Sequence, residues 1–261
     1  MSELFRLFAD SIMGTEFRGG LVGWPVSHSL SPEIHSMFLE HFGMKGSYLL
    51  YPVKPENLKP FLEDSGDGRF TGLNVTLPHK TAAAVLCSSL SPEAQRTSAV
   101  NTIVFGGGGV AGYNTDIAGF KAFSADMPAP FFVVGAGGAA AAVIEALDGT
   151  DFFVLKRGDI VLPENRPADA TVVNATPLGW NDDDLFPFEI PDGWFFADLN
   201  YNPRWNWRNR LLSPVRTGEK MLVEQAAESF RLWTGYTPDD ELKSKVLERI
   251  REILHDNKDN R

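Results

Sequence analysis

The sequence has a single cysteine, no long apolar run and a shortage of basic residues. Cys87 alone cannot form an intramolecular disulfide, and such low cysteine usage is typical of a reducing cytoplasm. No segment approaches the roughly 20 consecutive apolar residues that a membrane helix needs, and the first residues lack the pattern of a signal peptide. These absences predict a cytoplasmic protein without a membrane partner.

Charge and histidine spacing exclude two further classes. The formal net charge is −10, from 24 lysines and arginines against 34 aspartates and glutamates, so a nucleic-acid-binding surface is not expected. His28, His35 and His41 do not follow a zinc-ligand spacing such as H-E-x-x-H, and no metal site is predicted. The length of 261 residues suits one large domain or two modest ones.

Strand-type and helix-type segments alternate along the chain, which predicts an α/β fold. Two β-type runs flank the glycines at 106–109 and indicate a hairpin. The apolar run 131–134 is typical of a strand buried on both faces, and strong helix formers follow it at 139–147. Ser31, before Pro32, is expected to cap a helix.

A glycine-rich turn joins that buried strand to the following helix. Its sequence is Gly135-Ala136-Gly137-Gly138-Ala139-Ala140. The pattern G-x-G-x-x-A allows a tight turn and a close approach of the backbone to a pyrophosphate at the helix N-terminus. The turn therefore indicates dinucleotide binding, and the alternative is a glycine-rich connection without a ligand.

The residues after the next strand bear on the choice of cofactor. Lys156 and Arg157 follow Leu155, about 20 residues after the first glycine, where an NADP site needs a cation for the 2′-phosphate. We therefore expect NADP. Asp159 lies close enough to keep NAD open, and a solvated basic turn is the other alternative.

Seven segments, in order, resemble the shikimate dehydrogenase family. They are residues 27–32 (SHSLSP), 74–80 (NVTLPHK), 99–102 (AVNT), 114–116 (NTD), the glycine-rich turn, 174–176 (NAT) and 218–225 (GEKMLVEQ). The resemblance implies an N-terminal α/β substrate domain, 1–116, completed by C-terminal helices in 219–261. It also implies a Rossmann-type NADP domain at 117–218, and a monomer or homodimer.

The same resemblance implies the reversible NADPH-dependent reduction of 3-dehydroshikimate to shikimate, a step of the shikimate pathway that leads to chorismate and the aromatic amino acids. Lys80 and Asp116 match the family's catalytic pair. Hydride transfer to a carbonyl leaves an alkoxide that needs a proton, and a lysine, with an ordinary pKa of about 10.4, is a fair acid at neutral pH. We expect Lys80 to shuttle the proton and Asp116 to orient it. The alternative is that Lys80 is an ordinary surface lysine and that Asp116 only stabilises a turn.

Further site residues follow from the matched positions. Substrate contacts are implied for Ser29, Ser31, Thr76, Asn101, Tyr201 and Gln225. Cofactor contacts are implied for Gly135, Ala136, Gly137, Gly138, Ala139, Lys156, Arg157, Asn174, Thr176, Leu199 and Gly218.

One segment departs from the family's pattern. Only residues 158–170 separate the basic pair from the next strand, so the nucleotide sheet is expected to have a shortened edge, with weaker or less selective NADP binding. Two other functions remain open. One is an NAD-dependent quinate/shikimate dehydrogenase, and the other is a non-catalytic homologue that binds a metabolite.

Overall fold

The computed structural model describes residues 16–65, 68–106, 109–156, 162, 167–179, 186, 188–201 and 214–259. Arg157 and most of the segment 158–170 therefore lie outside the described residues, as does Asp159. Contacts divide the chain into two units. The first takes the described parts of Met1–Thr115 and Val223–Val246, and the second takes those of Asp116–Leu222 and Leu247–Arg261.

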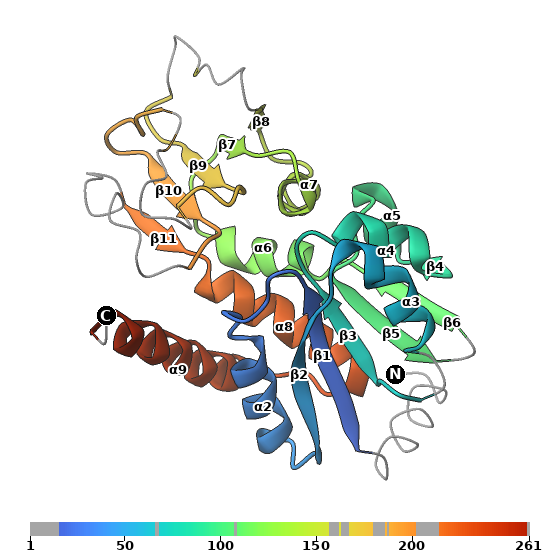
Figure 1. Cartoon of the computed structure of the whole chain (residues 1–261). Helices are drawn as coiled ribbons and strands as arrows, with labels where there is room; N and C mark the ends of the chain where they lie inside the picture. The colour runs from blue at the N-terminus through green and yellow to red at the C-terminus, as the bar shows by residue number, and fades with distance from the viewer. Residues whose placement is uncertain are drawn as a thin grey trace. The chain divides into compact units, whose positions relative to one another are not determined.

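The first unit contains a six-stranded mixed sheet in the order β2-β1-β3-β5-β6-β4 (Figure 1). Its strands are β1 (Phe17–Gly23), β2 (Gly46–Pro52), β3 (Gly72–Val75), β4 (Ser89–Leu90), β5 (Thr102–Gly106) and β6 (Gly109–Tyr113). β1 runs parallel to β2 and β3, whereas β5 is antiparallel to β3 and β6. The predicted hairpin across residues 106–109 is confirmed, because Gly106 pairs with Gly109.

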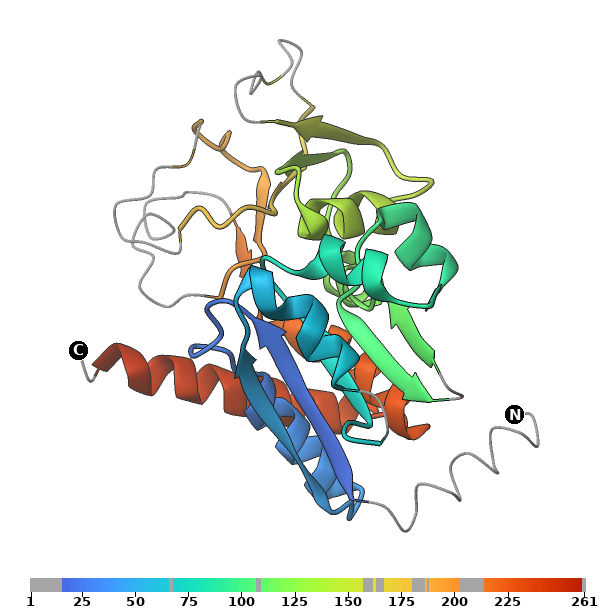
Figure 2. The same cartoon turned by 45° about the vertical axis from the view of Figure 1, so that its right-hand side comes forward.

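Helices cover both faces of this sheet, as Figure 2 shows. The helices of the unit are α2 (Ser31–His41), η1 (Pro55–Asn57), α3 (Leu58–Glu63), α4 (Lys80–Leu86), α5 (Pro92–Thr97), most of α8 (Glu219–Thr234) and the start of α9 (Asp240–Asp259). Leu58, Ala83 and Ala94 bring α3, α4 and α5 into one buried cluster with the sheet. On the opposite face, the Trp233 ring of α8 lies 5.8 Å from the Phe17 ring of β1.

The second unit contains a five-stranded parallel sheet in the order β11-β10-β9-β7-β8. Its strands are β7 (Phe131–Val134), β8 (Phe152–Leu155), β9 (Thr171–Asn174), β10 (Phe195–Asp198) and β11 (Val215–Thr217). The chain moves outward from β7 to β8 and then returns to the other side of β7 as β9. Ligands of open α/β sheets bind beyond the carboxyl ends of the strands at such a reversal.

The two faces of this sheet are covered differently. Helices α6 (Asp116–Ser124) and α7 (Gly138–Ala146) pack on one face, where Phe120 and Val143 are fully buried. Non-helical chain covers the other face within the described residues, and the Phe132 ring is stacked between the rings of Phe153 and Trp194 at 5.1 and 4.8 Å. β8 forms the edge of the sheet within the described residues, and the predicted shortening of that edge concerns residues 158–170, most of which lie outside them.

The last helix, α9 (Asp240–Asp259), begins where the Asp239 side chain accepts a hydrogen bond from the Leu242 amide at 2.8 Å. Leu242, Val246 and Ile250 form its buried stripe. Within the described parts of the chain, no helix combines the length and the apolar character that crossing a bilayer would require.

Candidate functional site

The glycine-rich turn follows β7 directly and has the backbone geometry of a nucleotide loop. Gly135 has a φ of +139°, which residues with a side chain rarely adopt, and a Cβ there would lie 2.9 Å from the Ala175 carbonyl oxygen. Gly137 is the N-cap of α7, and a Cβ at that position would meet nothing within 4 Å. The helix N-terminus therefore leaves room for a pyrophosphate to approach the backbone.

The predicted cofactor residues gather at the carboxyl edge of the second sheet. Gly138 and Ala139 begin α7, and the others follow the ends of the five strands: Gly135 after β7, Lys156 after β8, Thr176 beyond β9, Leu199 after β10 and Gly218 after β11. Parallel strands end at the same edge, so the fold brings these residues together. The role of each of these residues in cofactor binding remains a prediction.

Asn174 shapes the turn after β9 from a fully buried position. Its amide nitrogen donates to Asp198 Oδ1 and to the Leu178 carbonyl, both at 3.0 Å, and its Oδ1 accepts from the Thr176 hydroxyl at 2.6 Å. Asn200, which was not predicted, donates to the Thr176 carbonyl at 3.0 Å and to the Leu178 carbonyl at 2.9 Å. These contacts fix the turn and make Asn174 a support for the residues beside it.

Gly218 has no room for a side chain. A Cβ there would overlap the Leu199 carbonyl oxygen, so the backbones of these two predicted cofactor residues approach each other as only glycine allows. This contact fixes the start of α8 against the end of β10.

Tyr201 lies close to a carboxylate that the sequence patterns did not single out. Burial raises the pKa of Tyr201 to about 12, and the negative charge of Glu219 adds to the shift. The Thr217 hydroxyl donates a hydrogen bond to Glu219. The Tyr201 hydroxyl therefore keeps its proton at neutral pH.

The basic pair can be described only in part. Lys156 is exposed immediately after the buried Leu155, so its ammonium group is accessible to a 2′-phosphate, whereas Arg157 lies outside the described residues.

Ser29 and Ser31 form a hydroxyl pair at the start of α2. The Ser29 hydroxyl donates to the Ser31 hydroxyl at 3.1 Å and accepts from the Ser31 amide at 3.2 Å. The predicted capping role of Ser31 is wrong, because Leu30 occupies the N-cap position and Ser31 is already the first helical residue. The pair presents two hydroxyl groups at a helix N-terminus, which suits an anion.

Lys80 is the first residue of α4, and hydrogen bonds fix the chain around it. The Lys80 carbonyl accepts from the Val100 amide at 2.9 Å, and the His79 amide donates to the Thr76 carbonyl at 2.9 Å. The buried His79 ring contacts the Val53 carbonyl oxygen through Nε2 at 2.7 Å. Since a carbonyl only accepts, this nitrogen carries the proton, and His79 has a structural role.

Asn101 and Gln225 are brought together although 124 positions separate them. Asn101 Nδ2 lies 3.4 Å from Gln225 Oε1, and Asn101 Oδ1 accepts from the Thr115 amide at 2.7 Å. Asp116 comes next along the chain, begins α6 and is 6% exposed. Asn101 and Gln225, both predicted substrate residues, therefore belong to one hydrogen-bonded group. Thr115, the residue before the predicted catalytic Asp116, belongs to the same group.

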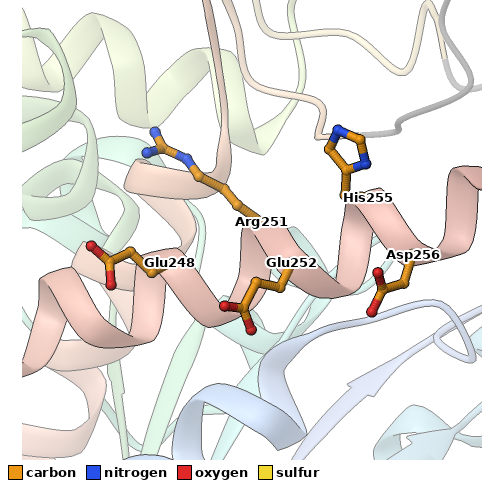
Figure 3. A pocket seen from close by; sticks show the side chains of 5 residues that line it. All are labelled: Glu248, Arg251, Glu252, His255 and Asp256. Atoms are coloured by element: carbon orange, nitrogen blue, oxygen red, sulfur yellow. The ribbon is translucent and has the colours of Figure 1, made fainter.

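A hollow of about 570 Å³ lies elsewhere, along α9. It is lined by Glu248, Arg251, Glu252, His255 and Asp256. Figure 3 shows Arg251 and His255 pointing to one side of the helix and Glu252 and Asp256 to the other. None of the predicted site residues lines this hollow, and we regard it as a surface feature of one charged helix. The described residues also contain no group of three or more metal-ligating side chains.

Comparison with known families matches two segments of the chain. Residues 21–103 match the shikimate dehydrogenase substrate binding domain, and residues 218–242 match the shikimate 5'-dehydrogenase C-terminal domain. The first match includes Ser29, Ser31, Thr76, Lys80 and Asn101, and the second includes Gly218 and Gln225.

Whole-length relatives extend this similarity. A shikimate dehydrogenase (NADP(+)) of Thermus thermophilus is 38% identical over 248 residues, covering 85% of this chain and 94% of that protein. One of Methanopyrus kandleri is 34% identical over 281 residues, covering 89% and 95%.

Solved structures agree with these sequence matches. The crystal structure of a Thermus thermophilus shikimate 5-dehydrogenase in complex with NADP(H) and shikimate superposes with a TM-score of 0.78 at 35% identity, covering 89% of this chain and 99% of that one. The enzyme from Aquifex aeolicus gives a TM-score of 0.80 at 28% identity, covering 89% and 97%.

Proposed function

Because this chain belongs to the shikimate dehydrogenase family, we propose that it catalyses the reversible, NADP(H)-dependent interconversion of 3-dehydroshikimate and shikimate. It is thus an oxidoreductase of the shikimate pathway that acts on a CH–OH group. The observation that carries the proposal is the likeness to the Thermus thermophilus enzyme in complex with NADP(H) and shikimate, over nearly the full length of that chain.

Reduction of the substrate carbonyl needs a hydride, which bound NADPH supplies, and a proton. We assign the proton transfer to Lys80 and the orientation of Lys80 and of the substrate hydroxyl to Asp116. The hydrogen-bonded turn before α4 supports the first assignment, and the anchoring of Thr115 on Asn101 supports the second. In the reverse direction Lys80 accepts the proton that the shikimate hydroxyl releases.

Substrate recognition is assigned to side chains of matching polarity. The Ser29–Ser31 pair, at the N-terminus of α2, suits the substrate carboxylate, and the protonated Tyr201 hydroxyl is a further donor for it. Asn101, Gln225 and Thr76 are assigned to the ring hydroxyls. A molecule without those hydroxyls would leave buried donors unpaired, which costs affinity.

The cofactor is NADP, in line with the relatives. The exposed Lys156 is a described residue whose positive charge suits the 2′-phosphate of NADP.

Replacing Lys156 by alanine should raise the KM for NADP+ by up to about tenfold, because a charge-assisted contact is lost. The KM for NAD+ should hardly change, because NAD+ has no 2′-phosphate. Equal changes for both cofactors would show that Lys156 does not recognise the 2′-phosphate.

The short segment 158–170 leads to a further prediction, which is that this protein binds NADP more weakly or less selectively than its relatives do.

The direct test is the absorbance change at 340 nm when purified protein is mixed with shikimate and NADP+. Turnover with this pair, and much slower turnover with NAD+ or with quinate, supports the proposal. Faster turnover with quinate and NAD+ favours the quinate/shikimate alternative. Binding of shikimate without turnover with either cofactor favours a non-catalytic metabolite-binding homologue.

Three further assignments are part of this proposal. The substrate domain comprises residues 1–116 and 219–261, and the NADP domain comprises 117–218. The protein is a monomer or homodimer. Its single cysteine supports a cytoplasmic location.

A further inference from the structure

Three buried hydroxyl groups lie behind the Asn101–Gln225 pair. They belong to Thr102, Thr115 and Ser229, which are 0%, 3% and 0% exposed, and we call them the hydroxyl cluster. The Ser229 hydroxyl oxygen lies 2.8 Å from that of Thr102 and 3.1 Å from that of Thr115. Ser229 comes from α8 and lies outside the seven segments that carry the family resemblance.

The Thr115 backbone fixes which way the Asn101 amide points. The Thr115 backbone N–H can only donate, so the Asn101 atom 2.7 Å from it must be the carbonyl oxygen. The hydroxyls of Thr102 and Thr115 lie 3.0 and 3.1 Å from the same oxygen. The NH2 group of Asn101 therefore points away from these hydroxyls, toward Gln225 Oε1 at 3.4 Å.

The orientation of Gln225 follows from that of Asn101. Because Gln225 Oε1 accepts from Asn101, and the Thr115 hydroxyl lies 3.5 Å from the same oxygen, the NH2 group of Gln225 points away from both. The donor side of Gln225 is therefore the side opposite the cluster, and a ring hydroxyl of the substrate that binds there would accept from it. A flipped pair would instead present an oxygen.

Ser229 connects this polarity to the helix backbone. A serine hydroxyl has one proton and two lone pairs. Its proton is directed to the Gln225 carbonyl at 3.0 Å, and the Asn74 side-chain amide donates to its oxygen at 3.0 Å. Thr102 can then donate to Ser229, and Thr115 to Asn101 Oδ1. In this arrangement every hydroxyl proton in the cluster has an acceptor.

We propose that Ser229 is a positioning residue. It holds Asn101 and Gln225 in the orientation in which their side-chain amides hydrogen-bond to the ring hydroxyls of the substrate. Ser229 acts through these two side chains, together with Thr102 and Thr115. The inference rests on the proposed function, because it assumes that Asn101 and Gln225 contact the substrate.

The chain offers a matched control on the same helix. Thr234 is 2% exposed, and its hydroxyl donates to the Phe230 carbonyl at 2.7 Å, four residues earlier, as Ser229 does to Gln225. Thr234 also accepts from the Tyr236 amide at 3.2 Å, but none of its described hydrogen bonds reaches Asn101 or Gln225. Ser229→Ala and Thr234→Val remove comparable buried hydroxyls, and only the first removes one from the cluster.

The test is the steady-state kinetics of these variants with shikimate and NADP+. Ser229→Ala should raise the KM for shikimate about tenfold with kcat and the KM for NADP+ within about twofold, because a buried polar network loses one member. Its preference for shikimate over analogues that each lack one ring hydroxyl should also shrink. Thr234→Val should leave these quantities near those of the unmodified protein. Equal changes in both variants, or an unchanged KM in Ser229→Ala, would overturn the proposal.

A second pair of variants decides the matter if Ser229→Ala does not fold. Thr102→Val keeps the shape of the side chain and removes its hydroxyl, whereas Thr102→Ser keeps the hydroxyl. The proposal requires a raised KM for shikimate in the first and a nearly normal one in the second, and equal values would contradict it. Failure of the proposed function would appear earlier, as absent turnover of the unmodified protein with shikimate.

Discussion

The two units differ in where their polar groups are buried. In the first unit a hydrogen-bonded network runs through the interior, linking Asn74, Asn101 and Ser229 across β3, β5 and α8. In the second unit both faces of the sheet are apolar, and Asn174 and Asp198 are buried at the carboxyl edge. This difference matches the proposed ligands. Fixed side chains, as in the first unit, can hydrogen-bond selectively to the ring hydroxyls of a substrate, whereas a pyrophosphate is bound largely by backbone groups.

If a residue of the first unit transfers the proton, replacing Lys80 should lower the turnover rate without weakening cofactor binding. Lys80→Ala should lower kcat by about 10²- to 10⁴-fold, the usual contribution of a positioned acid–base group, with the KM for NADP+ almost unchanged. Stopped-flow hydride transfer, followed at 340 nm, would measure the effect. Lys59→Ala, at an exposed lysine of the same unit, is the control. A kcat reduced less than tenfold would exclude Lys80 as the proton-transfer residue.

A pair of glycine replacements tests the backbone-based binding expected in the second unit. Gly137→Ala should raise the KM for NADP+ by about tenfold, or about 1.4 kcal/mol, because its methyl group would occupy the space that the pyrophosphate needs. Its melting temperature should be unchanged, since the Cβ meets nothing within 4 Å.

Gly135→Ala is the contrasting variant. Its positive φ predicts a loss of about 1–2 kcal/mol in the free energy of unfolding. Calorimetry and cofactor titration of both variants would separate the two effects. A destabilised Gly137→Ala with normal NADP+ binding would contradict this interpretation of the turn.

The smallest expected effect concerns an ion pair of the second unit. Arg216 contacts Asp126 through two hydrogen bonds of 2.6 and 2.8 Å, and this pairing lowers the pKa of Asp126 to about 2. The lowered pKa means that the pair stabilises the fold above about pH 4 and that this contribution disappears as the pH falls toward 2. The Asp126 side chain is 65% exposed, so Asp126→Asn should cost less than about 1 kcal/mol at pH 7.

Urea unfolding at pH 7 and pH 3 measures this contribution. The difference between the unmodified protein and Asp126→Asn should shrink at the lower pH. A difference that does not depend on pH would show that the carboxylate charge is not its source.

Local patterns predicted much of the second unit well. β7, the glycine-rich turn and α7 agree closely with the expected segments, because an apolar strand, two glycines and a run of alanines each restrict the backbone locally. β11 was not predicted, since three residues carry too little periodicity. α4 was not predicted either, although the alanines after Lys80 give a helix signal.

The site was predictable where motifs are local and not where contacts join distant segments. The family resemblance predicted Asn101 and Gln225 as substrate residues, and the structure brings their side chains within 3.4 Å of each other. Ser229, by contrast, contacts Thr102 across 127 positions, and no spacing rule reveals such a pair. The expected cap at Ser31 was wrong because α2 begins one residue earlier than the Ser-Pro pattern suggests. Local chemistry thus predicted which groups are present and not how they are held.

Each unit also contains an almost fully buried indole that can report on it optically. Trp233, in the first unit, donates to the Ile103 carbonyl at 2.9 Å, and Trp194, in the second, donates to the Pro167 carbonyl at 3.0 Å. Both are 1% exposed, whereas Trp24 is 43% exposed. With the other tryptophans replaced by phenylalanine, the fluorescence of either indole would follow the unfolding of its own unit. Coincident or separate transitions would then show whether the chain denatures in one step or two.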